Sequence, residues 1–425
     1  MNRGIVSMAR ADALACVRCG ERYPLTAWAE DCARCRSEAP ANLTVRYATE
    51  PPPLTREAIA KGPRTLWRWA DALPVDAADA VSLGEGSTPL VETPRLAREL
   101  GVGRLYVKDE SRNPTWSFKD RLATVAISSA RRLGARVIAS SSSGNAGAAV
   151  AAYAARAGLP CIVFTFTAAA GPMVTQMRAY GAMVLAVRDK ADRWKLLEAG
   201  VRRLGWFPTS PFLAPAIGSN PFGIEGYKTL AYEIAEALDW DVPDWCVLPV
   251  CYGDALYGMW KGFEELRRLH WIDRVPRLVA AEVYGSLGAA LADGADAVPD
   301  MPKTHATLAG SIGATRSTFQ ALAALRASGG AARTVGDDAL ITWQGALARE
   351  GLYVEPSSAA PLEAIRQLRS ERQIDAADSI VVVATAGGLK DPEVTARALG
   401  DVPVVAPSLD AVADTLARVY EFSIE

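Results

Sequence analysis

The sequence contains very little histidine and almost no net charge. Only two of its 425 residues are histidine, His270 and His305, and neither belongs to a catalytic or metal-binding pattern. Because histidine is the commonest general base, proton transfers in this protein are expected to depend on another residue. The net charge of −2 provides no basic field for nucleic acid or for an anionic membrane surface. We therefore expect no nucleic-acid partner.

Long apolar runs are also missing. No stretch approaches the roughly 20 apolar residues of a membrane span. The N-terminal "MNRGIVSMARADALAC" lacks the long apolar core of a secretory signal. Seven cysteines in 425 residues do not make a disulfide scaffold. These features predict a cytoplasmic protein without a membrane partner, and the length indicates two or three domains.

Four of the seven cysteines form a regular pattern. The stretch "CVRCGERYPLTAWAEDCARC" has the spacing C-x2-C-x12-C-x2-C. Two such pairs provide four thiolates for a tetrahedral zinc ion, and four protein ligands leave no open position, so the zinc would be structural. Free or disulfide-bonded thiols are the alternative, and a cytoplasmic location disfavours disulfides. The expected ligands of this zinc-ribbon-like module are Cys16, Cys19, Cys32 and Cys35.

After the Pro-rich stretch "ATEPPPL" (48–54), patterns typical of strands and helices alternate. Short apolar runs are separated by amphipathic segments of helix length. This alternation predicts an α/β fold with mostly parallel sheets, whose functional residues lie at the carboxyl ends of the strands. The expected strands are 136–140, 160–166, 183–187, 245–250, 277–283 and 379–385.

One lysine has unusual neighbours. In "NPTWSFKDR" (113–121), Trp116 and Phe118 stand just before Lys119. An amine in apolar surroundings loses part of its charge and becomes nucleophilic, so Lys119 is a candidate for reaction with a carbonyl group. Trp116 and Phe118 would shelter the amine in this interpretation, and plain core packing is the alternative for both rings.

Three polar loops each follow an expected strand. They are "SSSGNAG" (141–147), "PVCYGDALYGMWKGF" (249–263) and "TAGGLKD" (385–391). Backbone N–H groups at such strand-to-helix turns can bind anions, although helix capping explains the first loop, and Asp254 in the second, equally well. A reactive lysine, anion-binding turns and scarce histidine together fit pyridoxal phosphate, which needs an amine, a phosphate site and a partner for its ring nitrogen.

The chain resembles the threonine synthase family of pyridoxal-phosphate enzymes, which has the tryptophan-synthase-β-like fold called fold type II. The resemblance spans nearly the whole chain and follows the family's order. The matching stretches are "GEGSTPL" (84–90), "DESRNPTWSFKDR" (109–121), "SSSGNAG" (141–147), "SNPFGIEGYKT" (219–229), "LPV…WKGF" (248–263), "EGLYVEPSSAA" (350–360) and "TAGGLKDP" (385–392).

The resemblance implies specific roles for residues of these stretches. Lys119 would be the Schiff-base lysine, Asn145 would bond the cofactor's ring oxygen, and Thr385 would meet the pyridine nitrogen. The cofactor phosphate would bind at Cys251, Tyr252, Gly253, Asp254 and Ala255. The substrate would contact Ser142, Ser143, Gly144, Asn145, Ala146 and Gly147, with Asn220 and Arg121 as further substrate-binding residues.

The resemblance also implies an architecture. We expect two doubly wound α/β domains with the cofactor in the cleft between them, and a zinc-ribbon-like module at residues 1–47. The large domain would comprise residues 48–111 and 214–425, and the small domain residues 112–213. A homodimer is expected.

Four positions depart from the family pattern. Trp116 stands where the family usually has glycine, and "CYGDA" replaces a loop of the form G-N-G-G-N. Gly223 stands where threonine synthases usually have an arginine that handles the substrate's phosphate, and Tyr227 where they usually have glutamine. Losing the arginine would remove a bidentate phosphate contact, for which Arg121, Arg188 and Arg193 are the candidate replacements.

Three functional hypotheses follow. The first is a threonine-synthase-like lyase that performs γ-elimination and then adds water at Cβ of an amino acid such as O-phospho-L-homoserine. The second is a β-lyase or β-replacement enzyme acting on serine, phosphoserine, threonine or a diamino acid, which Gly223 favours. The third is a non-catalytic relative that binds the cofactor, which the presence of Lys119, Asn145 and Thr385 disfavours.

Overall fold

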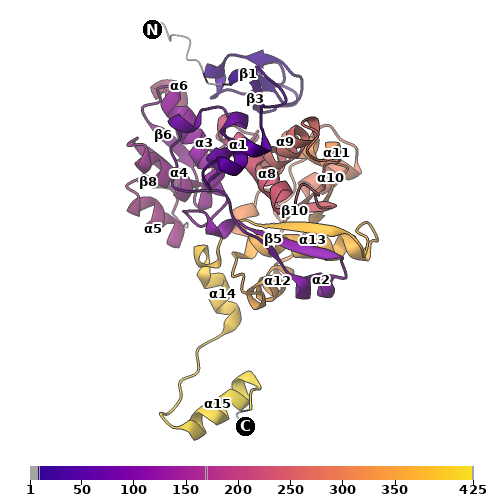
Figure 1. The fold of residues 1–425 in the computed structure, drawn as a ribbon. Coiled ribbons are helices and arrows are strands. Elements are labelled where there is room, and N and C mark those ends of the chain that lie inside the picture. The colour runs from indigo at the N-terminus through magenta and orange to yellow at the C-terminus, as the bar shows by residue number, and fades with distance from the viewer. Residues whose placement is uncertain (1–7, 9, 168, 170, 424–425) are drawn as a thin grey trace. The chain divides into compact units, whose positions relative to one another are not determined.

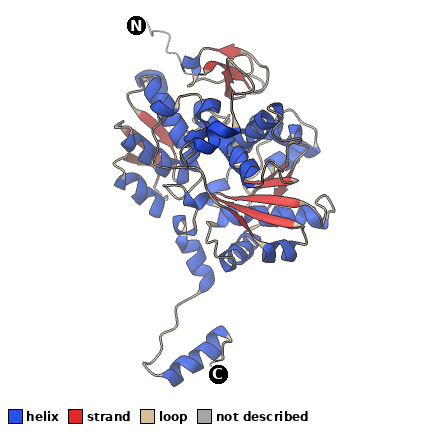
Figure 2. Cartoon of the chain, in the orientation of Figure 1, coloured by secondary structure: helices blue, strands red, loops and turns tan. Residues whose placement is uncertain are grey.

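The computed structural model describes residues 8, 10–167, 169 and 171–423, with helices and strands arranged as in Figure 2. The chain forms two compact units, one that ends at Asp391 and one that begins at Pro392. Residues 1–7 and 9 of the expected N-terminal module, residues 168 and 170 of the expected small domain, and residues 424–425 of the expected large domain lie outside the described residues.

The first unit begins with a small antiparallel sheet in the order β2-β1-β3. Its strands are β1 (Ala11–Cys16), β2 (Arg22–Tyr23) and β3 (Leu43–Tyr47). The four patterned cysteines lie within or between these strands, so a few short strands hold both cysteine pairs.

A six-stranded sheet in the order β12-β11-β10-β13-β5-β4 forms the larger α/β layer (Figure 1). All neighbouring strands are parallel except β4, which runs antiparallel to β5. Successive residues of β10 alternate between two hydrophobic cores, since Val247 packs into one core and Cys246 and Leu248 into the other. The strands are β4 (Leu90–Glu92), β5 (Arg104–Asp109), β10 (Trp245–Pro249), β11 (Arg277–Glu282), β12 (Ala331–Thr334) and β13 (Ser379–Ala384).

Helices cover both faces of this sheet, as a parallel sheet buried on both sides requires. Helix α13 packs on one face, and its Ile365 and Leu368 share a core with Val247. Helices α9 and α11 pack on the other face. The helices of this layer are α2 (Pro94–Leu100), α8 (Lys228–Ala237), α9 (Asp254–Arg268), α10 (Ser286–Ala292), α11 (Phe319–Ala327), α12 (Asp337–Arg349) and α13 (Pro356–Ser370).

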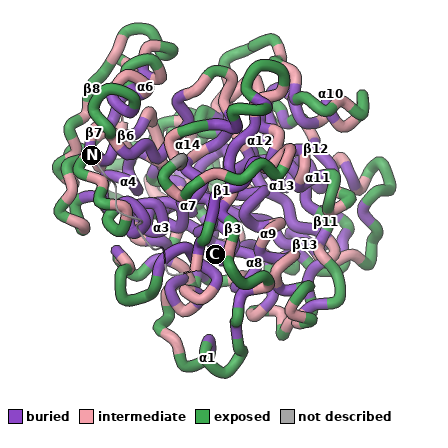
Figure 3. The backbone as a smooth tube through the Cα atoms, turned by 90° about the horizontal axis from the view of Figure 1, so that it is seen from above, coloured by how far each residue is buried: buried purple, intermediate pink, exposed green. Residues whose placement is uncertain are grey.

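A four-stranded, wholly parallel sheet in the order β8-β7-β6-β9 forms the second layer. Helices α3 and α4 are buried, whereas the edge strand β8 exposes Met183 and Leu185 (Figure 3). The elements are β6 (Ile138–Ser141), β7 (Cys161–Phe166), β8 (Met183–Val187), β9 (Phe207–Pro208), α3 (Lys119–Arg132), α4 (Asn145–Arg156), α5 (Pro172–Ala179) and α6 (Asp192–Leu204).

Two short helices complete the first unit, α1 (Arg56–Lys61) and α7 (Pro221–Ile224). The second unit contains α14 (Pro392–Leu399) and α15 (Leu409–Tyr420). Helix α15 begins at the N-cap Ser408, whose hydroxyl accepts from the Ala411 N–H.

The expected α/β fold with mostly parallel sheets is confirmed. All six expected strands are present, with ends that differ by at most two residues, and residues 183–187 match β8 in full. Strands β4, β5, β9 and β12 were not expected. No helix among the described residues is long and apolar enough to cross a membrane.

Candidate active site

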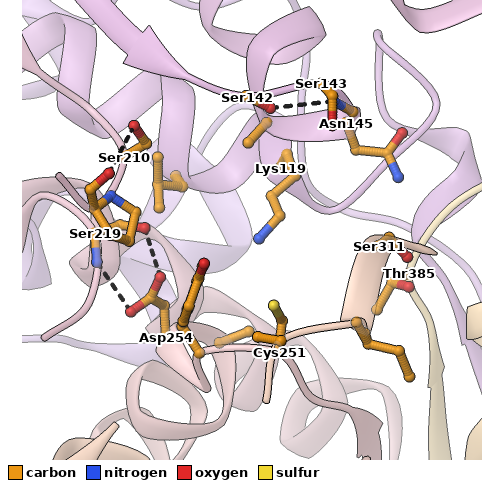
Figure 4. Close-up of a pocket in the computed structure, with 18 of the residues that line it drawn as sticks. Lys119, Ser142, Ser143, Asn145, Ser210, Ser219, Cys251, Asp254, Ser311 and Thr385 are labelled. Carbon is orange, nitrogen blue, oxygen red and sulfur yellow. Dashed lines mark hydrogen bonds between the residues drawn. The ribbon is translucent and has the colours of Figure 1, made fainter. Parts of the chain in front are cut away.

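The three polar loops identified in the sequence meet at one pocket (Figure 4). One follows β6, one follows β10 and one follows β13. Because neighbouring parallel strands present their carboxyl ends at one edge, each sheet contributes its loop ends to this site. Lys119, the first residue of α3, also lines the pocket.

The amine of Lys119 points into the pocket (Figure 4). Its Nζ lies 4.4 Å from the ring centroid of Phe118 and 5.7 Å from that of Tyr227. Burial lowers the pKa of Lys119, and the charges of Asp254, Cys251 and Glu355 oppose this effect only in part. The site therefore shifts the amine towards its neutral, nucleophilic form relative to an exposed lysine.

Trp116 does not shelter this amine. Its side chain is 52% exposed and is absent from the pocket lining. Its backbone has a φ of 65°, in the left-handed region that glycine adopts without strain. The ring instead lies near Lys390, whose Nζ is 5.9 Å from the ring centroid. Phe118 and Tyr227 provide the apolar surroundings that the sequence assigned to Phe118 and Trp116.

The loop after β6 is held in shape by Ser142. Its Oγ accepts hydrogen bonds from the Gly144 N–H at 3.2 Å and from the Gly147 N–H at 2.9 Å. Gly147 is outside the pocket lining, and a Cβ added there would lie 2.6 Å from Met177 Cε. The lining residues of this loop are Ser141, Ser142, Ser143, Gly144, Asn145 and Ala146.

Asn145 has one satisfied and one unsatisfied side-chain atom. Its Nδ2 donates to Glu355 Oε2 at 2.9 Å. Its Oδ1 is buried and has no hydrogen-bond partner among the residues that the structure describes. A buried polar atom without a partner in a pocket is where a ligand atom is expected.

The loop between β10 and α9 is shaped for an anion. Gly253 has a φ of 80°, and a Cβ there would lie 2.2 Å from Ala321 Cβ, so only glycine fits. The first turn of α9 follows at once and offers N–H groups without intrahelical acceptors. Cys251, Tyr252, Gly253, Asp254 and Ala255, the residues expected to bind the cofactor phosphate, all line the pocket.

Asp254 does not cap its own helix. It is the first residue of α9, and its carboxylate accepts from the Ser219 N–H at 3.2 Å, from Ser219 Oγ at 2.6 Å and from Gln320 Nε2 at 2.6 Å. These three donors stabilise the negative charge of Asp254 beside the anion-binding turn. The N-cap alternative raised for this residue is wrong.

The third loop places Thr385 in the pocket, where its Oγ1 lies 2.9 Å from Ser358 Oγ. Close by lies Glu355, a lining residue that the sequence analysis missed. Besides Asn145, it accepts from Ser311 Oγ at 3.1 Å. The stretch "EGLYVEPSSAA" contains Glu355, but its contact with Asn145 bridges 210 positions of sequence, and no local pattern reveals it.

Besides Gly147, two residues expected to bind substrate lie outside the pocket lining, Arg121 and Asn220. Arg121 is fully buried, and its guanidinium donates to both carboxylate oxygens of Glu110 and of Glu233 at 2.7–2.8 Å. The side chain of Asn220 caps α7 and donates to the Pro208 carbonyl at 3.0 Å. Both side chains therefore support the framework in this structure.

Gly223 also faces the protein interior. A Cβ at this position would lie 2.8 Å from Leu122 Cγ and 3.1 Å from Ala126 Cβ, both on α3. Position 223 is thus a close helix-packing contact, and an arginine there would overpack it.

Two cations line the pocket near the start of α6. Lys190 and Arg193 are both in the lining, whereas Arg188 is exposed and outside it. Of the three arginines considered as replacements for a phosphate contact, only Arg193 reaches the pocket. Lys190 was not singled out, because one lysine in the polar stretch "RDKADR" carries no distinguishing signal.

The pocket fits pyridoxal phosphate. Lys119 supplies an amine of lowered pKa, the Gly253 turn and α9 supply an anion site, and Asn145 Oδ1 needs a partner. Thr385 supplies a hydroxyl instead of a carboxylate, so it does not force protonation of a pyridine nitrogen. The residues predicted from the sequence to hold the cofactor therefore lie in one cavity.

The four patterned cysteines form a second cluster. Their sulfur atoms all lie within 4.8 Å of one another, with Cys16 Sγ 3.9 Å from Cys35 Sγ and Cys19 Sγ 3.6 Å from Cys32 Sγ. A tetrahedron with metal–sulfur bonds of about 2.3 Å has edges of about 3.8 Å. The cluster therefore has the dimensions of a four-thiolate metal site.

Comparison with known proteins agrees with this reading of the pocket. Residues 81–386 match the family model described as pyridoxal-phosphate dependent enzyme. A threonine synthase of Methanosarcina acetivorans is 36% identical over 412 residues, covering 95% of this chain and 98% of that protein. A threonine synthase of Methanocaldococcus jannaschii is 36% identical over 395 residues, covering 90% of this chain and 94% of that protein.

Solved structures share the fold at lower identity. Maize serine racemase superposes with a TM-score of 0.61 at 20% identity, covering 72% of this chain and 90% of that one. Diaminopropionate ammonia lyase from Escherichia coli superposes with a TM-score of 0.63 at 17% identity, covering 74% and 87%. The chain therefore belongs to the pyridoxal-phosphate dependent enzymes and is a threonine-synthase-like lyase of fold type II.

Proposed function

We propose that the enzyme acts on an amino acid with an activated γ-substituent, with O-phospho-L-homoserine as the leading substrate. The reaction would be elimination of the γ-group followed by addition of water at Cβ. The observation that carries the proposal is the Lys119 amine, which has a lowered pKa and points into a pocket lined by Asn145, Thr385 and an anion-binding turn.

Each residue has a task in this reaction. Lys119 would form the covalent link to the cofactor and, once released by substrate, would carry protons to and from Cα and Cβ of the substrate. N–H groups of the loop Ser142–Ala146 at the start of α4 would bind the substrate carboxylate. The turn Cys251–Ala255 would hold the cofactor phosphate. Bound pyridoxal phosphate would supply the electron sink that makes the Cα and Cβ protons acidic.

Lysine is suited to these proton transfers in a chain with so little histidine. A general base works best when its pKa is near the working pH, and burial moves Lys119 in that direction. Asn145, fixed by its bond to Glu355, would orient the cofactor ring.

A second candidate function is β-elimination or β-replacement on serine, phosphoserine, threonine or a diamino acid. The packing of Gly223 favours it, because position 223 cannot supply a phosphate contact. This reaction needs Lys119 to remove only the Cα proton. A non-catalytic role is disfavoured by the completeness of the pocket.

Further proposals concern the rest of the chain. The sulfur spacing in the four-cysteine cluster supports a structural zinc ion. The two parallel sheets support a large domain of residues 48–111 and 214–425 and a small domain of residues 112–213, with the pocket between them. A homodimer and a cytoplasmic location stay predictions.

One experiment separates the two reactions. The purified enzyme is incubated with O-phospho-L-homoserine, and phosphate and threonine are measured together. Serine, phosphoserine, threonine and a diamino acid are tested in parallel for release of ammonia and a keto acid. Equal yields of phosphate and threonine support the γ-reaction. Keto-acid release without threonine formation would replace it with the β-lyase reaction.

A further inference from the structure

Lys190 and Arg193 lie together on one side of the active-site pocket. Lys190 lies two residues before α6 and Arg193 lies in its first turn, just after the edge strand β8. Both approach the ring of Phe166, at 5.7 Å for Lys190 Nζ and 5.3 Å for the Arg193 guanidinium carbon. Lys190 is exposed, whereas Arg193 is only 7% exposed. One aromatic ring thus holds two cations near each other.

Neither cation is neutralised by an acid. Among the described residues, no carboxylate forms an ion pair with Lys190 or Arg193, and Arg193 Nε donates to the Lys190 carbonyl at 3.0 Å. Burying a guanidinium without a counter-charge is unfavourable, because the charge loses its hydration. The start of a helix is also an unfavourable place for a cation, because the helix dipole is positive there. Both effects destabilise the folded chain, so we expect the positive charge at this position to serve a function.

The electrostatic field of this corner is positive. Burial and the charge of Arg193 both lower the pKa of Lys190, and the charge of Lys303 adds to this. Burial lowers the pKa of Arg193, and Tyr252 opposes this effect only in part. Tyr252 belongs to the anion-binding turn, and its ring lies 6.4 Å from that of Trp194 on α6. The two cations therefore lie at the same end of the pocket as that turn.

We propose that Lys190 and Arg193 form a subsite for a phosphate monoester inside the active-site pocket. A planar guanidinium binds two phosphate oxygens at once, and a lysine ammonium adds a mobile point charge. The phosphate belongs either to the cofactor or to the substrate. The substrate case rests on the proposed function, and it would give this chain the phosphate contact that Gly223 cannot supply.

The test uses the variants Lys190→Gln and Arg193→Gln in the full chain. Lys195→Gln is the matched control, since Lys195 lies on the same helix but is exposed and paired with Asp192. In the first arm, dissociation constants are measured for pyridoxal phosphate and for pyridoxal, which lacks the phosphate. In the second arm, the cofactor-loaded enzyme is titrated with O-phospho-L-homoserine and with L-homoserine, and binding is followed by the visible absorbance.

We expect a loss of affinity of about tenfold or more for the phosphorylated member of one pair, with the unphosphorylated member unchanged. A loss in the first arm assigns the subsite to the cofactor, and a loss in the second assigns it to the substrate. Unchanged affinities for both phosphorylated ligands in both variants would overturn the proposal. Because Lys190 is exposed, its variant gives a valid answer even if Arg193→Gln fails to fold.

The same data separate this proposal from the proposed function. Weaker binding of O-phospho-L-homoserine in the variants, without threonine formation by the unmodified enzyme, would support the subsite and reject the γ-reaction. Normal threonine formation with unchanged KM and unchanged cofactor affinity in both variants would reject the subsite and leave the reaction in place.

Discussion

Replacing Asp120 with asparagine should make the protein less stable in acid and more stable in alkali than the unmodified chain. Asp120 follows Lys119 in α3 and is fully buried. It accepts from the Thr115 N–H at 3.2 Å and from Thr115 Oγ1 at 2.7 Å, and also bonds the Tyr153 hydroxyl. Burial, with a smaller effect of the Glu85 charge, raises the pKa of Asp120 from 3.8 to about 7.

The direction of the effect follows from proton binding. Between pH 3.8 and about 7 the folded chain keeps the Asp120 proton and the unfolded chain has lost it, so the free energy of unfolding falls as the pH rises. Each unit of pKa difference between the folded and unfolded chains corresponds to about 1.4 kcal/mol. The free energy of unfolding therefore falls by roughly 4 kcal/mol between pH 3.8 and about 7. Roughly 3 kcal/mol of this falls between pH 5 and 8.

Asparagine removes this dependence. It keeps an acceptor for Thr115 but loses one hydrogen bond, at about 1 kcal/mol. The variant should thus be about 1 kcal/mol less stable at pH 3, where the unmodified chain keeps the proton in both states, slightly more stable at pH 5, and roughly 3 kcal/mol more stable at pH 8. Urea unfolding followed by tryptophan fluorescence at pH 3, 5, 6, 7 and 8 measures these differences. Asp192→Asn, at an exposed position, is the control. Parallel pH profiles of the unmodified chain and the Asp120 variant would refute the reasoning.

Three further predictions concern other parts of the chain. Lys119→Ala should abolish the borohydride-trapped link to the cofactor, and a persisting link would move the assignment to another lysine. Elemental analysis should find one zinc per chain, which Cys16→Ser combined with Cys19→Ser should remove without loss of the cofactor's visible absorbance. Trp116→Gly should be more stable to urea than Trp116→Ala by about 1 kcal/mol, because alanine keeps the strain of a positive φ; equal stabilities would contradict this.

Local patterns were enough to predict most strands of the two sheets. Strand β8 was predicted in full because "MVLAV" is a short apolar run with turn residues on both sides. Strand β5 was missed because it contains Lys108, which reads as a surface residue but is buried against Glu233, with Nζ 2.7 Å from Oε2. Strand β12, "AART", has neither the length nor the residue types of a typical strand.

Pocket residues that stand in contiguous loops were identified from the sequence. Pocket residues whose role depends on a partner far away in the chain were missed. Lys119, Asn145 and Thr385 stand in recognisable stretches. Glu355 acquires its role only through Asn145, far away in the chain. Arg121 was expected to contact the substrate because it stands close to the reactive lysine in the sequence. In the folded chain its guanidinium binds Glu110 and Glu233 instead.

The exposed edge strand β8 and the buried helix that begins with Lys119 tolerate substitution to different degrees. Lys119 begins a buried helix whose next two residues are fixed in the interior, so few substitutions there would leave a folded chain. The segment from β8 to the start of α6 lies at the rim of its sheet, where residues 188–190 are exposed. Substitutions in that segment would change which substituent of the substrate can enter the pocket, and they would lower the stability of the fold only slightly. With the proposed subsite at this rim, the choice of substrate and the proton transfers of the lysine would depend on separate parts of the chain, so that either could be altered by substitution without the other.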